Sequence, residues 1–175
     1  MIEELTTKRF LLRRIKDSDL NNIYKGLSHP EVIKYYGVSY NSLEATREQM
    51  RWFRELEQKE TGGWRAICSA GDETFLGATG FNNLSKEHKK TELGFWILPE
   101  FWGRGIIQEL LPVICNYAFE NLHLHRIEAF VESENVNSAK ALKNQGFQHE
   151  GTMVDSEVKN GKFISVELFA KLKSK

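Results

Sequence analysis

Apolar residues recur along this chain with two periods, and the two periods predict strands and helices in a mixed order. Near-alternating or continuous short apolar runs predict strands over residues 10–15, 64–69, 74–81, 91–98, 126–131, 147–158 and 163–172. Apolar residues three or four positions apart predict helices over residues 20–27, 43–60 and 105–121, with short helices after 29 and after 135. This order predicts an α/β fold, with a mixed, mostly antiparallel sheet and flanking helices.

Turn residues mark how the strands connect. Residues 70–73, which read Ala-Gly-Asp-Glu, predict a hairpin between two of the strands. The pair Asn160-Gly161 is a strong signal for a type I′ hairpin between the last two. Residues 82–90 are polar, and we expect a loop there that leads into the strand at 91–98.

Capping residues mark where the helices begin. Residues 17–19 offer three N-cap candidates, and Ser42 is the expected cap of the helix that runs to residue 60. Pro112 is expected to kink or loosen the helix over 105–121. The apolar face of the helix after Ser42 is expected to point inward with Leu43, Thr46, Met50 and Phe53.

The stretch from residue 91 to residue 109 organises the chain. A buried strand is followed by a turn with Gly103 and Gly105, and then by the first turn of a long helix. Such a turn directs several backbone N–H groups one way, and the helix dipole supports them, so a phosphate or pyrophosphate site is predicted. A tight connection without a ligand is the alternative. The turn is not a P-loop, because no Lys-Ser or Lys-Thr follows it, and it lacks the third glycine of a dinucleotide fingerprint.

Length and charge indicate the number of domains and the kinds of partner to expect. The 175 residues suit one domain, residues 1–175, that buries about two-thirds of its unfolded surface. The chain carries 24 basic and 24 acidic residues, so no electrostatic attraction to nucleic acid or to an anionic membrane is predicted.

The sequence shows no targeting segment, no membrane-spanning segment and no disulfide framework. The N-terminus is acidic without an apolar core, and no apolar run approaches 18 residues, so we expect a cytoplasmic protein that does not span a membrane. Cys68 and Cys115 lie in apolar surroundings and are expected to be buried free thiols. His123 and His125 have no accompanying acidic or cysteine cluster, so we expect a loop there and no metal site.

Two motifs in the right order resemble the GNAT superfamily of acetyl-CoA-dependent N-acetyltransferases. Residues 102–107 read Trp-Gly-Arg-Gly-Ile-Ile and look like its pyrophosphate loop, and Asn135-x-x-Ser138 followed by Gly146-Phe147 resembles its second signature. The N-terminal region is similar to the branch of ribosomal-protein alanine N-acetyltransferases, at Thr7, Arg9, Leu12 and Arg13. The resemblance implies one N-acetyltransferase domain of the GNAT, or acyl-CoA N-acyltransferase, fold. In that fold the strands at 91–98 and 126–131 splay apart to admit the acyl-CoA.

The resemblance also implies which residues bind acetyl-CoA. Main-chain groups would hold the pantetheine arm and the pyrophosphate, and an amide near 94–96 would polarise the thioester carbonyl. Trp102 replaces the usual Gln or Arg, and Ile107 replaces a small residue, so Ile107 is expected to turn its side chain into the core. The implied cofactor-binding residues are Phe95, Trp96, Ile97, Trp102, Gly103, Arg104, Gly105, Ile106, Ile107 and Asn135.

The catalytic residues follow from the same resemblance. Many family members place a tyrosine at the position of Leu142 as acid for the leaving thiolate; the ribosomal-protein branch implies Ser138 in that role and Glu157 as base. Ser138 could instead be only a first-turn hydroxyl, and Glu157 a solvated strand residue. Glu92 is the competing base, and its strand is expected to bury it more deeply than Glu157.

The acceptor is expected to be a primary amine. Being neutral near pH 7.5 costs a lysine roughly 4 kcal/mol and an α-amine well under 1, which favours the N-terminus of a protein or peptide. A small amine such as a polyamine, an amino acid or an antibiotic is the alternative, and a non-catalytic acyl-CoA-binding module is the second. We expect a monomer or homodimer. Residues that could form an acidic groove for a polyamine are Glu44, Glu48, Glu55 and Glu57.

Overall fold

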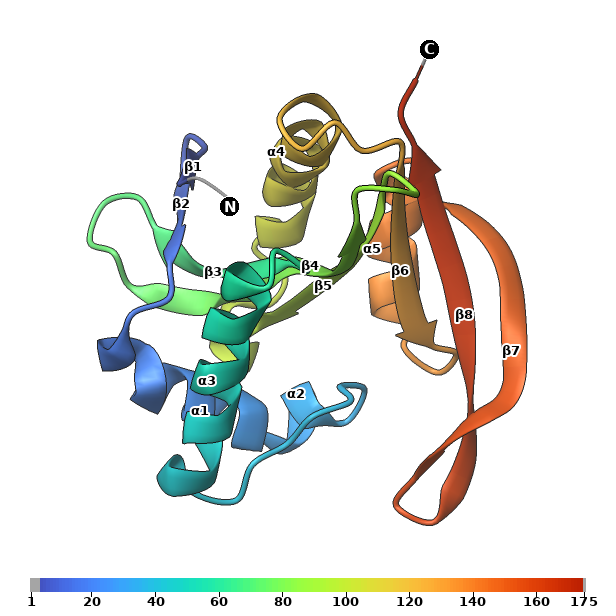
Figure 1. Cartoon of the computed structure of the whole chain (residues 1–175). Coiled ribbons are helices and arrows are strands. Elements are labelled where there is room, and N and C mark those ends of the chain that lie inside the picture. The colour runs from blue at the N-terminus through green and yellow to red at the C-terminus, as the bar shows by residue number, and fades with distance from the viewer. Residues whose placement is uncertain (1–3, 175) are drawn as a thin grey trace.

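A computed structural model describes residues 4–174, and an eight-stranded sheet forms their centre (Figure 1). The strand order is β1-β2-β3-β4-β5-β6-β8-β7. Only β5 and β6 pair in parallel, and every other neighbouring pair is antiparallel, which confirms the mixed, mostly antiparallel α/β fold. The strands are β1 (Leu5–Thr6), β2 (Phe10–Arg14), β3 (Gly63–Ser69), β4 (Phe75–Ser85), β5 (Lys90–Ile97), β6 (Arg126–Glu132), β7 (Gln148–Lys159) and β8 (Lys162–Leu172).

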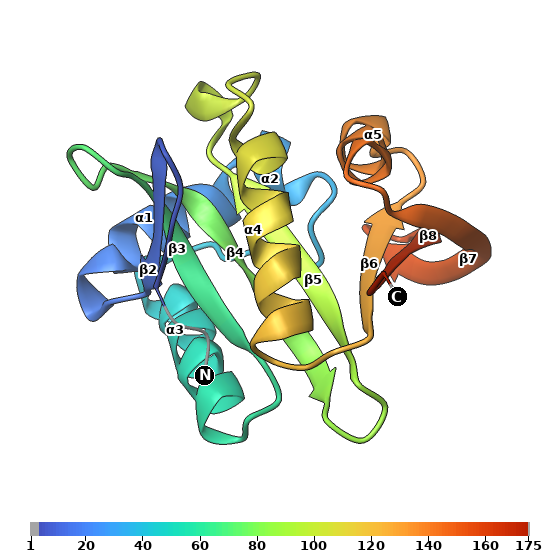
Figure 2. The same ribbon diagram turned by 90° about the horizontal axis from the view of Figure 1, so that it is seen from above.

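Helices cover both faces of this sheet (Figure 2). The helices are α1 (Leu20–Ser28), α2 (Pro30–Ile33), α3 (Leu43–Gln58), α4 (Ile106–Glu120) and α5 (Val136–Asn144), with 3-10 turns η1 (Asp17–Asp19) and η2 (Pro99–Phe101). One apolar cluster packs α1 and α3 against one face of the sheet, and a second packs α4 and α5 against the other. Within residues 4–174, no helix is both long and apolar enough to cross a membrane.

Most local signals of the sequence are confirmed. The Ser42 hydroxyl accepts a hydrogen bond from the Ala45 N–H at 3.1 Å and so caps α3. Asn160 and Gly161 have φ values of 51° and 74°, as a type I′ turn between β7 and β8 requires. Pro112 lies inside α4, which continues on both sides of it. Proline cannot donate to the Gln108 carbonyl one turn earlier, and this carbonyl instead accepts from Gln145 Nε2 at 3.4 Å.

Three local predictions hold only in part. The polar stretch 82–90 forms a turn only at residues 86–89, because β4 runs to Ser85 and pairs with β5 in an extended hairpin. Leu43 is 41% exposed, since the first turn of α3 extends past the core. Asp19 is the N-cap residue of α1, but its side chain makes no capping hydrogen bond, because its two carboxylate oxygens accept from the buried Arg13 guanidinium at 2.8 and 2.9 Å.

Candidate functional site

The site begins where β5 and β6 part. Their parallel pairing covers only Lys90↔Arg126, Thr91↔Ile127 and Glu92↔Glu128. Beyond Glu92, β5 continues to Ile97 without a partner on that side, while β6 stays paired with β8 to Glu132 (Figure 2). The splay that the family resemblance implies is therefore present. It leaves a free strand edge on β5.

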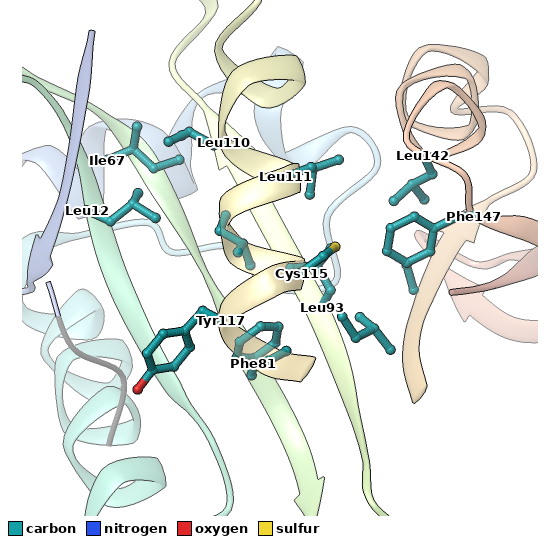
Figure 3. Close-up of a cluster of buried hydrophobic side chains, with 14 of the residues drawn as sticks. Leu12, Ile67, Phe81, Leu93, Leu110, Leu111, Cys115, Tyr117, Leu142 and Phe147 are labelled. Atoms are coloured by element: carbon teal, nitrogen blue, oxygen red, sulfur yellow. The ribbon is translucent and has the colours of Figure 1, made fainter. Parts of the chain in front are cut away.

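Apolar side chains join the two arms of the splay on one face of the sheet. Leu111 and Cys115 of α4 face Leu142 of α5 and the neighbouring Phe147 (Figure 3). Leu142 has no exposed surface, so the position of the family tyrosine belongs to the core here. Burial raises the pKa of Cys115 to about 11, which keeps this thiol protonated and unreactive.

Main-chain groups of β5 line the free edge. The N–H of Leu98, directly after β5, donates to the Leu76 carbonyl of β4 at 2.8 Å. Because successive residues of a strand direct their main-chain groups to opposite sides, Phe95 and Ile97 present theirs to the gap. Trp96 directs its groups toward β4, and its ring is buried in the core. The Ile97 carbonyl accepts from the indole Nε1 of Trp102 at 2.7 Å, which lays this half-exposed side chain along the edge.

The predicted anion loop lies next to this edge. Gly103 and Gly105 have φ values of 73° and 70°, and α4 begins directly after them at Ile106. The first N–H groups of α4 have no partner within the helix and therefore point out of its N-terminus. A Cβ on Gly105 would meet Gln108 Oε1 at 3.5 Å and Arg9 Nη2 at 3.6 Å, which are ordinary contacts. Its left-handed backbone, rather than lack of space, is what requires glycine.

Arg9 anchors the loop, a role that the sequence did not reveal. Its Nη1 donates to the Arg104 carbonyl at 3.0 Å, and its Nε donates to Glu109 Oε2 at 2.6 Å. The Thr7 hydroxyl donates to the other oxygen of Glu109 at 2.6 Å. The Thr7 hydrogen bond first, and then those from Arg9, lower the pKa of Glu109. The family resemblance marks Thr7 and Arg9, but nothing local in the sequence indicates that they meet α4.

Ile107 packs half-buried against the apolar cluster under α4, and the neighbouring Ile106 is buried. Its side chain therefore lies on the core side of the helix, as expected from the sequence.

Truncation of this side chain should cost stability rather than binding. We expect Ile107→Ala to lower the free energy of unfolding by about 2 kcal/mol, at the lower end of core truncations because the site is half-buried. Urea denaturation measures this change, and acetyl-CoA titration should give nearly unchanged affinity. A large gain in affinity at unchanged stability would show that Ile107 obstructs the loop.

The second arm of the splay carries Asn135 and Ser138. Asn135 caps α5, since its Oδ1 accepts from the Ser138 N–H at 3.2 Å. Ser138 lies half-buried in the first turn of α5, one helix turn before the buried Leu142. A hydroxyl is thus present near the end of β6, on the arm opposite the Trp102–Gly105 loop.

Three carboxylates on β5, β6 and β7 differ in their surroundings. The Cα registers place Glu157, Glu128 and Glu92 on one face of the sheet, the face covered by α1 and α3. Burial opposes ionisation of Glu128, but hydrogen bonds from Arg126 and Lys90 outweigh it, and the pKa of Glu128 is lowered. Glu128 is therefore a salt-bridged carboxylate with little capacity as a base.

Glu92 and Glu157 are the two remaining base candidates. Glu92 is half-buried and accepts from Asn83 Nδ2 at 3.0 Å, whereas Glu157 is exposed on β7, as the sequence predicts. Burial raises the pKa of Tyr36. Electrostatic interactions with Tyr40 and with the Glu92 carboxylate add to this rise. A protonated tyrosine thus lies within electrostatic reach of Glu92. The described residues contain no group of three or more His, Cys, Asp or Glu placed to hold a metal.

Comparison with known proteins gives one family. Residues 9–148 match the family model of the acetyltransferase (GNAT) domain. The uncharacterized N-acetyltransferase YoaA of Bacillus subtilis is 33% identical over 162 residues, which cover 92% of each chain.

Solved structures agree with this chain in fold. An acetyl transferase of Salmonella typhimurium that modifies the N-terminal serine of ribosomal protein L7/L12 aligns with a TM-score of 0.89 at 20% identity, over 98% of this chain and 100% of that one. Spermidine N-acetyltransferase of Vibrio cholerae, in complex with CoA and spermine, aligns with a TM-score of 0.85 at 22% identity, over 95% and 96% of the two chains.

Proposed function

This chain belongs to the GNAT family of acetyltransferases, and we propose that it transfers the acetyl group of acetyl-CoA to the α-amine of a protein or peptide. The observation that carries the proposal is the parting of β5 and β6 at Glu92, beside a glycine loop at the N-terminus of α4. A free strand edge and an anion site lie next to each other there. The pantetheine arm and the pyrophosphate of acetyl-CoA need this pair of features.

The residues fit acetyl-CoA in the following roles. The N–H groups from Gly103 to Ile107 bind the pyrophosphate, and Arg9 fixes the loop through the Arg104 carbonyl. Phe95 and Ile97 offer main-chain groups to the pantetheine arm from β5, and Asn135 offers its amide from the other arm. The Phe95 N–H faces the gap and stabilises the negative charge that develops on the thioester oxygen.

Transfer forms one C–N bond and breaks one C–S bond. The neutral amine attacks the thioester carbon, and Glu157 accepts the proton that leaves the nitrogen. Ser138 donates a proton to the departing sulfur, so that free CoA leaves as a thiol. Glu157 is exposed, so water can carry the transferred proton away and return one to Ser138 between turnovers.

The charges on α3 favour an α-amine over a polyamine as the acceptor. Three of the four α3 carboxylates that could form an acidic groove have cationic partners: Glu44 pairs with Arg47, Glu55 with Lys59, and Glu57 with Arg14 and Arg65. An α-amine also needs the weakest base, because its pKa lies near neutrality. The Salmonella relative in fold acts on such an amine, whereas the Vibrio relative takes a polyamine, which remains the second candidate.

Thiol release from acetyl-CoA tests the proposal. The acceptor panel should contain peptides with free N-terminal serine or alanine, the same peptides with blocked N-termini and one free lysine, spermidine, spermine and free amino acids. We expect release with free α-amines and little with blocked peptides. Release with polyamines alone would support the second candidate, and acetyl-CoA binding without release would indicate a non-catalytic module.

Loss of the Arg9 anchor should weaken cofactor binding. Arg9→Met keeps an unbranched side chain but removes the donors to Arg104 and Glu109. One charge-assisted hydrogen bond contributes about 1.5–3 kcal/mol, so the Kd for acetyl-CoA should rise about tenfold. Calorimetric titration measures it, with Arg47→Met on the exposed part of α3 as control. Equal affinities of the two variants would contradict the anchor role.

A further inference from the structure

The tip of the β7–β8 hairpin extends past the rest of the sheet. The pairing of β8 with β6 ends at Glu132↔Val166, and from there to the turn β8 pairs only with β7 (Figure 1). The register of β7 shifts between Met153 and Glu157, where Asp155 has a φ of 49°. A two-stranded ribbon with an irregular strand is only marginally stable by itself. Something outside the hairpin must fix its tip if Glu157 is to stay in one place.

Lys159 provides that connection. Its Nζ donates to Glu132 Oε1 on β6 at 2.6 Å and to the main-chain carbonyl of Lys34, directly after α2, at 2.7 Å. Only 22% of the Lys159 side chain and 15% of the Glu132 side chain are exposed. Pairs that are this well shielded from water are weakened less by salt than surface pairs are. One ammonium group therefore holds together three elements that are distant in sequence.

Glu157 is carried by the same short segment. It precedes Lys159 by two residues on β7, so both side chains leave the same face of the strand. The segment held by the Lys34 carbonyl also contains Tyr36, which lies near Glu92. The contact of Lys159 thus sets the hairpin tip against the segment that follows α2.

We propose that Lys159, bonded to Glu132 and to the Lys34 carbonyl, is a positioning residue that fixes the hairpin tip and so holds Glu157 at the acetyl-transfer site. This inference rests on the proposed function, in which Glu157 is the base. Lys159 does not touch the reacting atoms in this role. It restricts where the Glu157 carboxylate can lie, which matters because small displacements of a catalytic group cost large factors in rate.

The test compares Lys159→Met with Lys162→Met. Lys162 is exposed on the other side of the same turn, so its variant controls for loss of one positive charge on the hairpin. Hydrogen exchange of the amides in residues 155–165 should accelerate at least about tenfold in Lys159→Met and little in Lys162→Met. The value of kcat should fall about tenfold in the first variant alone, while the acetyl-CoA-induced shift in melting temperature is kept. Lys159→Arg, which keeps the charge and the donors, should recover most of the rate.

A second comparison separates positioning from general stability. In a Glu157→Gln background, Lys159→Met should lower kcat little further, because the group that it positions is already lost. Equal rate losses in both backgrounds would overturn the inference, and so would unchanged exchange of the hairpin amides in Lys159→Met. If Glu157→Gln alone leaves kcat unchanged, the proposed base is wrong; the exchange experiment still decides whether Lys159 fixes the tip.

Discussion

Glu157→Gln is expected to lower kcat at least about tenfold, because a general base contributes roughly 10²–10⁴-fold to such a transfer. The substitution keeps the size of the side chain and removes only its ability to accept a proton. Glu157 is exposed and is not among the residues proposed to bind acetyl-CoA, so the affinity for acetyl-CoA should remain nearly intact. The pH–rate profile should also lose its lower limb, because the group whose deprotonation produces that limb is gone. Thiol release measured over a range of pH tests this.

Two further substitutions test whether Glu157 is the base. Glu92→Gln should reduce kcat less and stability more, because Glu92 is half-buried and hydrogen-bonded to Asn83. Ser138→Ala should cost less than Glu157→Gln, since a thiolate leaves readily without full proton donation. If Glu92→Gln abolishes turnover while Glu157→Gln is silent, the base is the carboxylate on β5.

Gly105→Val is expected to remove most of the stabilisation that acetyl-CoA gives to the folded protein. A ligand at 100 times its Kd stabilises the native state by about 2.7 kcal/mol, which appears as a rise in melting temperature. Gly105 has a φ of 70°, which a β-branched residue resists strongly. The valine side chain would also lie beside the N–H groups that we propose bind the pyrophosphate. Differential scanning fluorimetry with and without acetyl-CoA measures the shift.

The matched control is Gly71→Val. Gly71 lies in an exposed turn, has no left-handed backbone and has no atom within 4 Å of an added Cβ. This variant should keep the full shift. An unaltered shift in a folded Gly105→Val protein would show that the pyrophosphate does not bind at this loop.

Features that depend only on neighbouring residues could be predicted from the sequence. The strand–glycine turn–helix unit around Gly103 and Gly105 follows from local apolar periodicity and from the freedom of glycine at positive φ. The caps at Ser42 and Asn135 and the turn at Asn160-Gly161 are local for the same reason. The order of elements then indicated the mixed sheet, and two motifs indicated the family.

Contacts between segments that are distant in sequence could not be predicted and became visible only in the folded protein. Periodicity says which face of an element is apolar, but not which side chain of another element meets a given polar group. Arg9 therefore bonds to Arg104 and Glu109 across about a hundred positions, and Lys159 reaches the Lys34 carbonyl across 125. The length of the loop before β5 was decided in the same way. The sequence predicts a loop over residues 82–90, and a turn does form at 86–89, but main-chain pairing with β5 extends β4 to Ser85. Backbone hydrogen bonds do not depend on side-chain polarity.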